Sequence, residues 1–199
     1  MKTTKIKLLI ILLIASFTHS CSKDDEKILA PIPVVYEEEN PLTRFLTTSG
    51  LDQQSYEVNG LSNQEAGFSF RPTVKGRINA LVLKSHRTYI TRVTIWNKLT
   101  ETVLRTELVN INVANADVII QIPPLELEIN KEYFISINNK YWFERYRTDS
   151  GVINYPISAG NISITGCSRI HDGINQTFPS QALTNSYKGD CSFKFQRTE

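Results

Sequence analysis

The sequence holds few of the residues that catalytic centres and metal sites most often use, and none of the short motifs that identify them. It contains only three cysteines and three histidines among 199 residues. It has no Gly-x-Ser-x-Gly elbow, no His-Glu-x-x-His, no Cys-x-x-Cys and no glycine-rich phosphate loop. These absences lower the expectation of an enzyme, and we expect no cofactor and no bound metal.

Signals for long helices are also missing. Alanine is scarce, and no apolar run of helical period extends beyond two turns. Pro123 and Pro124 interrupt one candidate helix, because proline cannot continue a helical hydrogen-bond pattern. Aromatic and β-branched residues are plentiful, and they are the residues that favour strands. The composition therefore predicts a protein built mainly from β-strands.

The first twenty residues have the three parts of a secretory signal peptide. Three lysines open the segment, an apolar run follows over 8–15, and small or polar residues at 18–20 precede Cys21. The apolar run is about half of the roughly 20 residues that a membrane-spanning helix needs. We therefore expect residues 1–20 to be removed on export.

Cys21 lies where a bacterial lipoprotein signal has its acylated cysteine, and the segment resembles the looser signals of Bacteroidetes-type lipoproteins. Thr18 departs from that pattern, in which leucine is usual. The charged run 22–26 is similar to the short lysine-plus-acidic signal that sends such proteins to the cell surface. The resemblance implies lipidation of Cys21 and a lipid-anchored, surface-exposed position at the outer membrane. The alternatives are a soluble exported protein and an ordinary solvated charge run.

The charge balance changes once the signal peptide is removed. Removing residues 1–20 takes away three lysines and no acidic residue, so the formal charge changes from +2 to −1. No basic patch remains that would suggest nucleic acid as a partner. The partner expected from the sequence is the membrane, through the lipid anchor, together with a glycan or another envelope protein.

The mature chain divides into a tether and one domain. Residues 21–41 contain Pro31, Pro33 and three consecutive glutamates, a composition typical of an extended linker. Residues 42–199 are long enough for a single domain with its own core. We find no internal repeat and no second domain.

Short runs of alternating apolar and polar residues recur along this domain, separated by turn residues. This period of two is the pattern of half-buried strands. The run 78–83 is apolar on both faces and predicts a central strand. The fold class predicted is all-β, a single β-sandwich of jelly-roll type. Strands are expected within 42–48, 66–70, 78–83, 89–96, 102–109, 118–122, 133–137, 162–164 and 193–195.

The two remaining cysteines, Cys167 and Cys191, favour a disulfide, because an exported domain meets oxidising conditions. Two buried free thiols are the alternative. A metal site that combined these cysteines with His86 and His171 would lack any recognised ligand spacing.

Several fragments, in this order and spacing, resemble a bacterial domain-of-unknown-function family, number four-zero-eight-two. The resemblance covers roughly residues 60–197 and departs from the family at Leu99-Thr100 and Lys188-Gly189. It implies a β-sandwich module of a surface protein, and some family members lie beside carbohydrate-acting domains. It implies no catalytic residue. The fragments are Glu65–Phe70, Gly76–Leu81, Val93–Asn97, Leu127–Ile137, Phe178-Pro179 and Asp190–Phe193.

The run Tyr-Trp-Phe-Glu-Arg-Tyr at 141–146 is the strongest candidate for a ligand site. Consecutive aromatic residues cannot all point inward from one strand, so at least one ring should face solvent. Tyr141, Trp142, Arg145 and Tyr146 could form a platform on which a sugar ring stacks. The alternative is a strand whose odd members fill the core and whose even members cover an edge.

The function predicted from the sequence is therefore a non-catalytic binding module, with a glycan as the ligand. A structural or accessory protein-interaction module of the cell envelope is the first alternative. A glycoside-acting hydrolase is the second, because Glu101, Glu107 and Glu144 could supply a pair of carboxylates.

Overall fold

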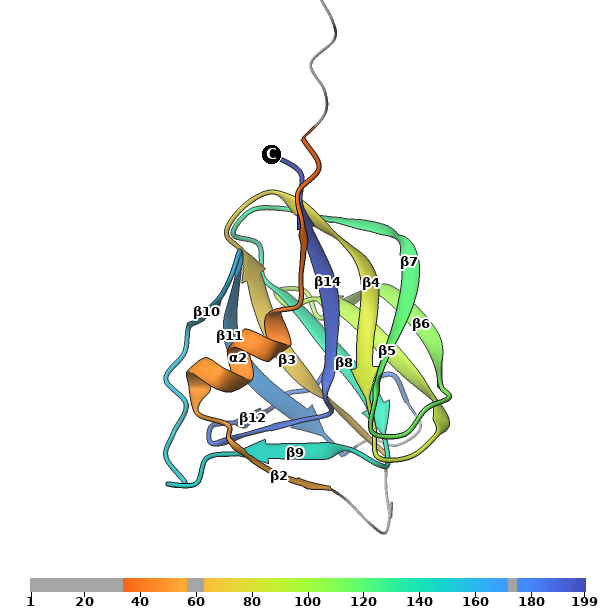
Figure 1. The fold of residues 1–199 in the computed structure, drawn as a ribbon, viewed down its shortest axis with the longest axis vertical. Helices are drawn as coiled ribbons and strands as arrows, with labels where there is room; N and C mark the ends of the chain where they lie inside the picture. The colour runs from red at the N-terminus through yellow and green to blue at the C-terminus, as the bar shows by residue number, and fades with distance from the viewer. Residues whose placement is uncertain (1–33, 57–62, 172–174) are drawn as a thin grey trace, which may run out of the picture. The chain divides into compact units, whose positions relative to one another are not determined.

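A computed structural model describes residues 34–56, 63–171 and 175–199 (Figure 1). The predicted signal peptide, the predicted lipidation site Cys21 and most of the predicted tether lie outside the described residues. Residues 35–199 form one compact unit. Within the described ranges, no helix is both long enough and apolar enough to cross a membrane.

The described residues of the domain form mostly β-strands and one short helix, which confirms the all-β prediction. Every strand pairing is antiparallel. In chain order the elements are β1 (Glu38–Glu39), α2 (Pro41–Ser49), β2 (Gln53–Tyr56), β3 (Gln64–Pro72), β4 (Gly76–Lys84), β5 (Tyr89–Asn97), β6 (Thr102–Ile111), β7 (Asp117–Leu127), β8 (Tyr133–Asn139), β9 (Phe143–Tyr146), β10 (Ile157–Ala159), β11 (Ile162–Ile170), β12 (Gln181–Leu183), β13 (Ser186–Lys188) and β14 (Cys191–Arg197).

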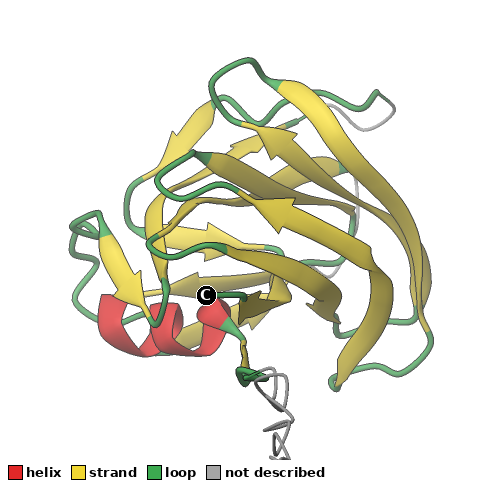
Figure 2. Ribbon diagram, turned by 90° about the horizontal axis from the view of Figure 1, so that it is seen from above, coloured by secondary structure: helices red, strands yellow, loops and turns green. Residues whose placement is uncertain are grey.

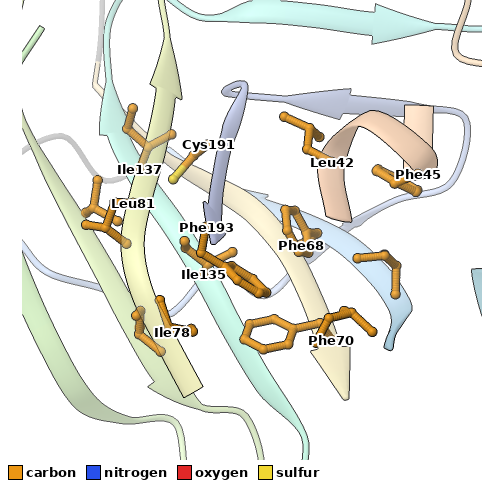
Figure 3. Close-up of a cluster of buried hydrophobic side chains, with 14 of the residues drawn as sticks. Leu42, Phe45, Phe68, Phe70, Ile78, Leu81, Ile135, Ile137, Cys191 and Phe193 are labelled. Carbon is orange, nitrogen blue, oxygen red and sulfur yellow. The ribbon is translucent and has the colours of Figure 1, made fainter. Parts of the chain in front are cut away.

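Residues of two large antiparallel sheets share one core, and a small third sheet is also present. The four-stranded sheet has the order β1-β14-β4-β7, and the seven-stranded sheet has the order β10-β11-β3-β8-β5-β6, with β12 beside β11. The third sheet has the order β13-β9-β2. Between the two large sheets the ring of Phe193 lies 4.6 Å from that of Phe70 and 6.1 Å from that of Phe68 (Figure 3).

The alternation of apolar residues located the strands well. Each of the predicted strand ranges from residue 66 onward falls inside an observed strand. The run 78–83 belongs to β4, which lies between β14 and β7 and is therefore central in its sheet, as predicted. Phe68 and Phe70 are fully buried on the same face of β3.

The predicted strand at 42–48 is wrong, because these residues form helix α2. Asn40 caps the start of the helix, accepting a hydrogen bond from the Leu42 backbone N–H at 3.1 Å, and Pro41 occupies the first turn. Gly50 ends the helix in the left-handed conformation, with φ of 71°. The helix lies at one margin of the strand layers (Figure 2) and inserts Phe45 into the core.

A short strand lies before residue 42, within the segment predicted as tether. Glu38 and Glu39 form β1, which pairs with β14. The adjacent acidic side chains do not simply repel one another, because each has a polar partner. The Asn79 side-chain amide donates to Glu38, and the Asn161 backbone N–H donates to Glu39 at 3.0 Å.

The structure contradicts the predicted disulfide and shows the alternative, two buried free thiols. Cys167 is on β11 of the seven-stranded sheet, whereas Cys191 begins β14 of the four-stranded sheet. Facing sheets are about 10 Å apart, whereas the Cα atoms of a disulfide usually lie within about 7 Å of each other. Burial raises the pKa of the Cys167 thiol to about 12, and it raises the pKa of Cys191 as well.

We expect both thiols to resist alkylation in the folded protein at neutral pH, because only the thiolate is nucleophilic and both groups are buried. In denaturant without any reductant, iodoacetamide should modify Cys167 and Cys191 completely. Peptide mass spectrometry with and without prior reduction measures this directly. A peptide pair joined through these two cysteines in the non-reduced digest would contradict the expectation.

Candidate ligand-binding site

The predicted aromatic platform at 141–146 does not form. Trp142 is only 7% exposed, and the Lys188 ammonium lies 5.6 Å from the centre of its ring. Tyr141 packs its ring edge-on against Tyr89, at 5.6 Å. Of the three aromatic residues predicted to form the platform, only Tyr146 is largely accessible to solvent, with 38% of its surface exposed. The alternative prediction holds in part, because Phe143 is buried and Tyr146 is exposed, but Trp142 lies before β9 and is buried as well.

Arg145, the fourth predicted residue, forms a buried ion pair with Asp190. Its Nε donates to Asp190 Oδ1 at 2.9 Å, and its Nη2 donates to Asp190 Oδ2. Asp190 is 2% exposed. Burial lowers the pKa of Arg145, but the hydrogen bond and the charge of Asp190 outweigh that effect and raise it. The two parallel hydrogen bonds therefore hold the guanidinium and the carboxylate in a fixed geometry.

The turn between β13 and β14 holds Asp190 in place. Gly189 and Asp190 both have positive φ, at 115° and 36°. A Cβ on Gly189 would lie 2.7 Å from the Ile137 side chain, so glycine is required here for space as well as for conformation. The Gly189 N–H donates to the Phe143 carbonyl at 3.0 Å, and the Lys84 N–H donates to the Asp190 carbonyl at 3.0 Å. These backbone hydrogen bonds hold Asp190 in the position from which its side chain pairs with Arg145.

A pocket of about 320 Å³ opens beside this ion pair. Helix α2 forms one wall, and the end of β4 and the start of β7 form the other. We call it the helix-side pocket. It is lined by Asn40, Leu42, Thr43, Leu46, Thr47, Val82, Leu83, Lys84, Asp117, Arg145 and Asp190.

The lining of the helix-side pocket combines an apolar surface with a few polar groups, the usual composition of a small-molecule site. The leucines and Val82 supply the apolar part. Threonine hydroxyls from α2 supply neutral hydrogen-bonding groups, and Lys84 and Asp117 supply one charge of each sign. Because the charges are balanced, the pocket suits a neutral polyhydroxy ligand better than an ion.

A second hollow, of about 560 Å³, lies against α2 and the Ala159-Gly160 turn. It shares Asn40, Thr43 and Thr47 with the helix-side pocket. Glu39 and Arg44 supply its charged groups, but Glu39 already accepts hydrogen bonds from Asn161. Arg44 is useful as a control, because it lines this hollow and is absent from the lining of the helix-side pocket.

Sequence reasoning missed a polar cluster on the outer face of the seven-stranded sheet. Glu65 is completely buried there. This is unexpected, because the alternation of polar and apolar residues around it places its side chain on the face away from the core. Its Oε1 accepts from Arg92 Nε at 3.2 Å, and its Oε2 accepts from Ser136 Oγ at 2.9 Å. Ser136 in turn accepts from Trp96 Nε1 at 2.9 Å.

A segment distant in the sequence covers this cluster. The Asn175 carbonyl accepts from Arg92 at 3.0 Å, and the Gln176 side chain donates to Thr94 at 2.9 Å. The Phe178 ring packs edge-on against Trp96 at 5.6 Å. Because these polar groups have partners within the protein, we assign the cluster to stability rather than to ligand binding.

The structure does not support the carboxylates proposed for a hydrolase as an acid–base pair. Glu107 on β6 has Arg105 as its partner at 3.7 Å. Glu144 on β9, in the third sheet, has Lys188 as its partner at 3.2 Å. Glu101 lies in the turn between β5 and β6.

A search of protein-family models found no match for the chain, and a search of curated proteins found none either. The resemblance to the domain family named above therefore remains a prediction.

Proposed function

We propose that this protein is a lipid-anchored protein of the outer membrane surface whose single domain, a β-sandwich of jelly-roll type, is a non-catalytic binding module. We propose a glycan as its ligand and the helix-side pocket as its site. This replaces the platform at 141–146 as the location and keeps Arg145 as one of the residues involved.

The composition of the helix-side pocket carries this proposal. A hexose presents an apolar C–H face and several hydroxyl groups, and the pocket pairs leucine side chains with threonine hydroxyls and two charged groups. Its volume of about 320 Å³ is at the lower end of the range for small-molecule sites, which suits one sugar residue rather than a long chain. The Arg145–Asp190 pair gives the pocket a fixed wall.

Binding of the purified full chain, in detergent, to a glycan array tests the proposal. We expect a double variant, Lys84→Ala with Asp117→Ala, to lose at least about tenfold in affinity, because roughly 1.4 kcal/mol of binding free energy corresponds to that factor. Neither residue is buried, so the variant should fold normally. Isothermal titration with the best glycan gives the affinities.

Arg44→Ala is the matched control, because Arg44 is exposed and lines only the neighbouring hollow. Its affinity should equal that of the wild type. Equal binding by the double variant would remove the helix-side pocket as the site. A complete lack of glycan binding by the wild type would remove the glycan as the ligand class.

One observation favours the alternative, a protein-interaction module of the envelope. Several large apolar side chains are exposed near one edge of the seven-stranded sheet: Ile90, Val103, Leu104 and Leu108. Exposed apolar groups that gather on one surface often mark a protein contact.

A further inference from the structure

Strand β6 forms a long open edge of the seven-stranded sheet. One side of it pairs with β5, and among the described residues no strand pairs with its other side. The strand is ten residues long. An open edge of this length presents a row of backbone N–H and C=O groups to which another strand can pair.

The edge lacks three of the features that usually protect such strands. It contains no proline and no lysine, and it is not short. Its exposed side chains include Leu108, at 75%, and Leu104, at 42%. Ile90 on the adjoining strand β5 is 69% exposed. This apolar surface continues to the open edge, so a strand added there would cover part of it.

The sequence around Thr106 is complementary to itself. When two copies of β6 are placed antiparallel with Thr106 opposite Thr106, Arg105 of each copy lies opposite Glu107 of the other. In the same register each Leu104 lies opposite a Leu108. Opposite charges and apolar residues are the cross-strand pairs that stabilise antiparallel strands, and a two-fold axis makes every such pair occur twice.

Neighbouring registers lose this match. Centring the pair on Arg105 would place Glu107 opposite Val103, and centring it on Glu107 would place Arg105 opposite Val109. All three of these registers keep the same side chains on the same face of the sheet. Only the register centred on Thr106 also places opposite charges opposite each other and leucine opposite leucine. Leu104 is the extra residue of a bulge in β6 between Val103 and Arg105, which disturbs regular pairing there, so we expect the backbone contact to centre on 105–107, with Leu104 contributing through its side chain.

The charged residues are accessible for such a contact. The side chains of Arg105 and Glu107 are 21% and 33% exposed and lie 3.7 Å apart within one chain. Arg105 also donates to the Pro123 carbonyl at 2.7 Å. A second copy would give each charge an additional partner of opposite sign, without breaking the contacts that it already makes.

We infer that β6 is the interface at which two copies of this protein join, with their seven-stranded sheets continuing into one another across an antiparallel pair centred on Thr106. The partner is thus a second copy of the same chain. This inference goes beyond the proposed function and does not depend on the identity of any ligand.

Cysteine cross-linking of the full chain in membranes tests the register. In an antiparallel pair centred on Thr106, the two Thr106 Cα atoms would lie about 4.5–5.5 Å apart, within the range that a disulfide bridges. Thr106→Cys should therefore give a covalent dimer on a non-reducing gel after mild oxidation. Leu108→Cys is the control, because its two copies would be separated by four residues of strand, about 13 Å, and should not cross-link.

A second pair of variants protects the test against a local effect at Thr106, whose hydroxyl accepts a hydrogen bond from Gln176 at 2.6 Å. Leu104→Cys and Leu108→Cys, co-expressed, should cross-link to each other while neither does so alone. The inference would be overturned by the absence of a dimer from every variant, or by equal cross-linking of Thr106→Cys and Leu108→Cys. Cross-linking of Thr106→Cys only to a protein of different mass would also overturn it, because the partner would then be another protein.

Discussion

Replacing Phe68 with alanine is expected to lower the free energy of unfolding by about 3–5 kcal/mol. Phe68 is fully buried, and its ring lies between the two large sheets and beside the helix. It contacts four other aromatic rings at centroid distances of 6.0–6.2 Å, namely Phe45, Phe70, Tyr187 and Phe193. Removing the ring would leave a cavity that rigid neighbours cannot fill, which adds to the lost burial of apolar surface.

Chemical denaturation followed by circular dichroism measures this loss. The midpoint should fall while the slope stays constant, because the surface exposed on unfolding is almost the same. Tyr146→Ala is the matched control, since it removes an aromatic ring that is 38% exposed and should change stability by less than about 0.5 kcal/mol. A loss below about 1 kcal/mol for Phe68→Ala would show that this ring is not central to the core.

Replacing Arg92 with methionine should cost about 3–5 kcal/mol at neutral pH, because it leaves a buried carboxylate without its counter-charge. That carboxylate is Glu65, whose side chain is not exposed at all. Ser136 would remain as a hydrogen-bond partner, but a hydroxyl cannot replace a positive charge. The loss of stability comes from leaving the Glu65 charge buried without a partner. Removing both members of a buried ion pair together often changes stability very little.

The sign of the pH dependence follows from Glu65. Burial raises its pKa, although the bonds from Arg92 and Ser136 lower it. The folded state therefore holds the proton more tightly than the unfolded state, whose glutamate pKa is about 4.3. The stability that this group contributes is present below that value and falls as pH rises through the folded pKa. Arg92→Met removes interactions that lower the pKa, so the range over which stability falls should extend to higher pH.

We therefore expect the destabilisation by Arg92→Met to be much smaller near pH 4 than near pH 8, because Glu65 is then protonated in both states. Thermal or chemical unfolding at a series of pH values measures this. The double variant Arg92→Met with Glu65→Gln is the control and should lose most of the pH dependence. A loss that is independent of pH would contradict the assignment of the effect to the Glu65 charge.

The strands could be predicted because their signal is local. Alternation on β3 and β4 reports directly which face meets the core, and it located both strands. The region 42–48 failed because its apolar residues fit two periods at once. Leu42, Phe45 and Leu46 also fit a helix, and the signals that decide are the flanking Asn40-Pro41 and Gly50. Those capping residues were visible in the sequence and outweigh the alternation.

The candidate site was less predictable because its parts come together from distant segments. Trp142 directly precedes β9, and the Lys188 ammonium from β13 lies over its ring. Arg145 was predicted as a ligand residue, but its partner Asp190 lies 45 residues later. Alternation predicts an outward side chain at Glu65, but that position is buried, and Arg92, its partner, also binds the distant Asn175 carbonyl. No local pattern carries this information.

The pairing of β1 with β14 determines where a mechanical load would enter the domain. The chain before α2 runs beside β14 (Figure 1). Glu38 and Glu39 lie beside Gln196 and Phe195, and the Gln196 side chain also donates to the Tyr36 carbonyl at 2.7 Å. A pull transmitted through the residues before Val35 would thus act first on the contacts with the last strand. Because β14 is flanked on its other side by β4, the force would spread into the middle of a sheet rather than peel away an isolated loop.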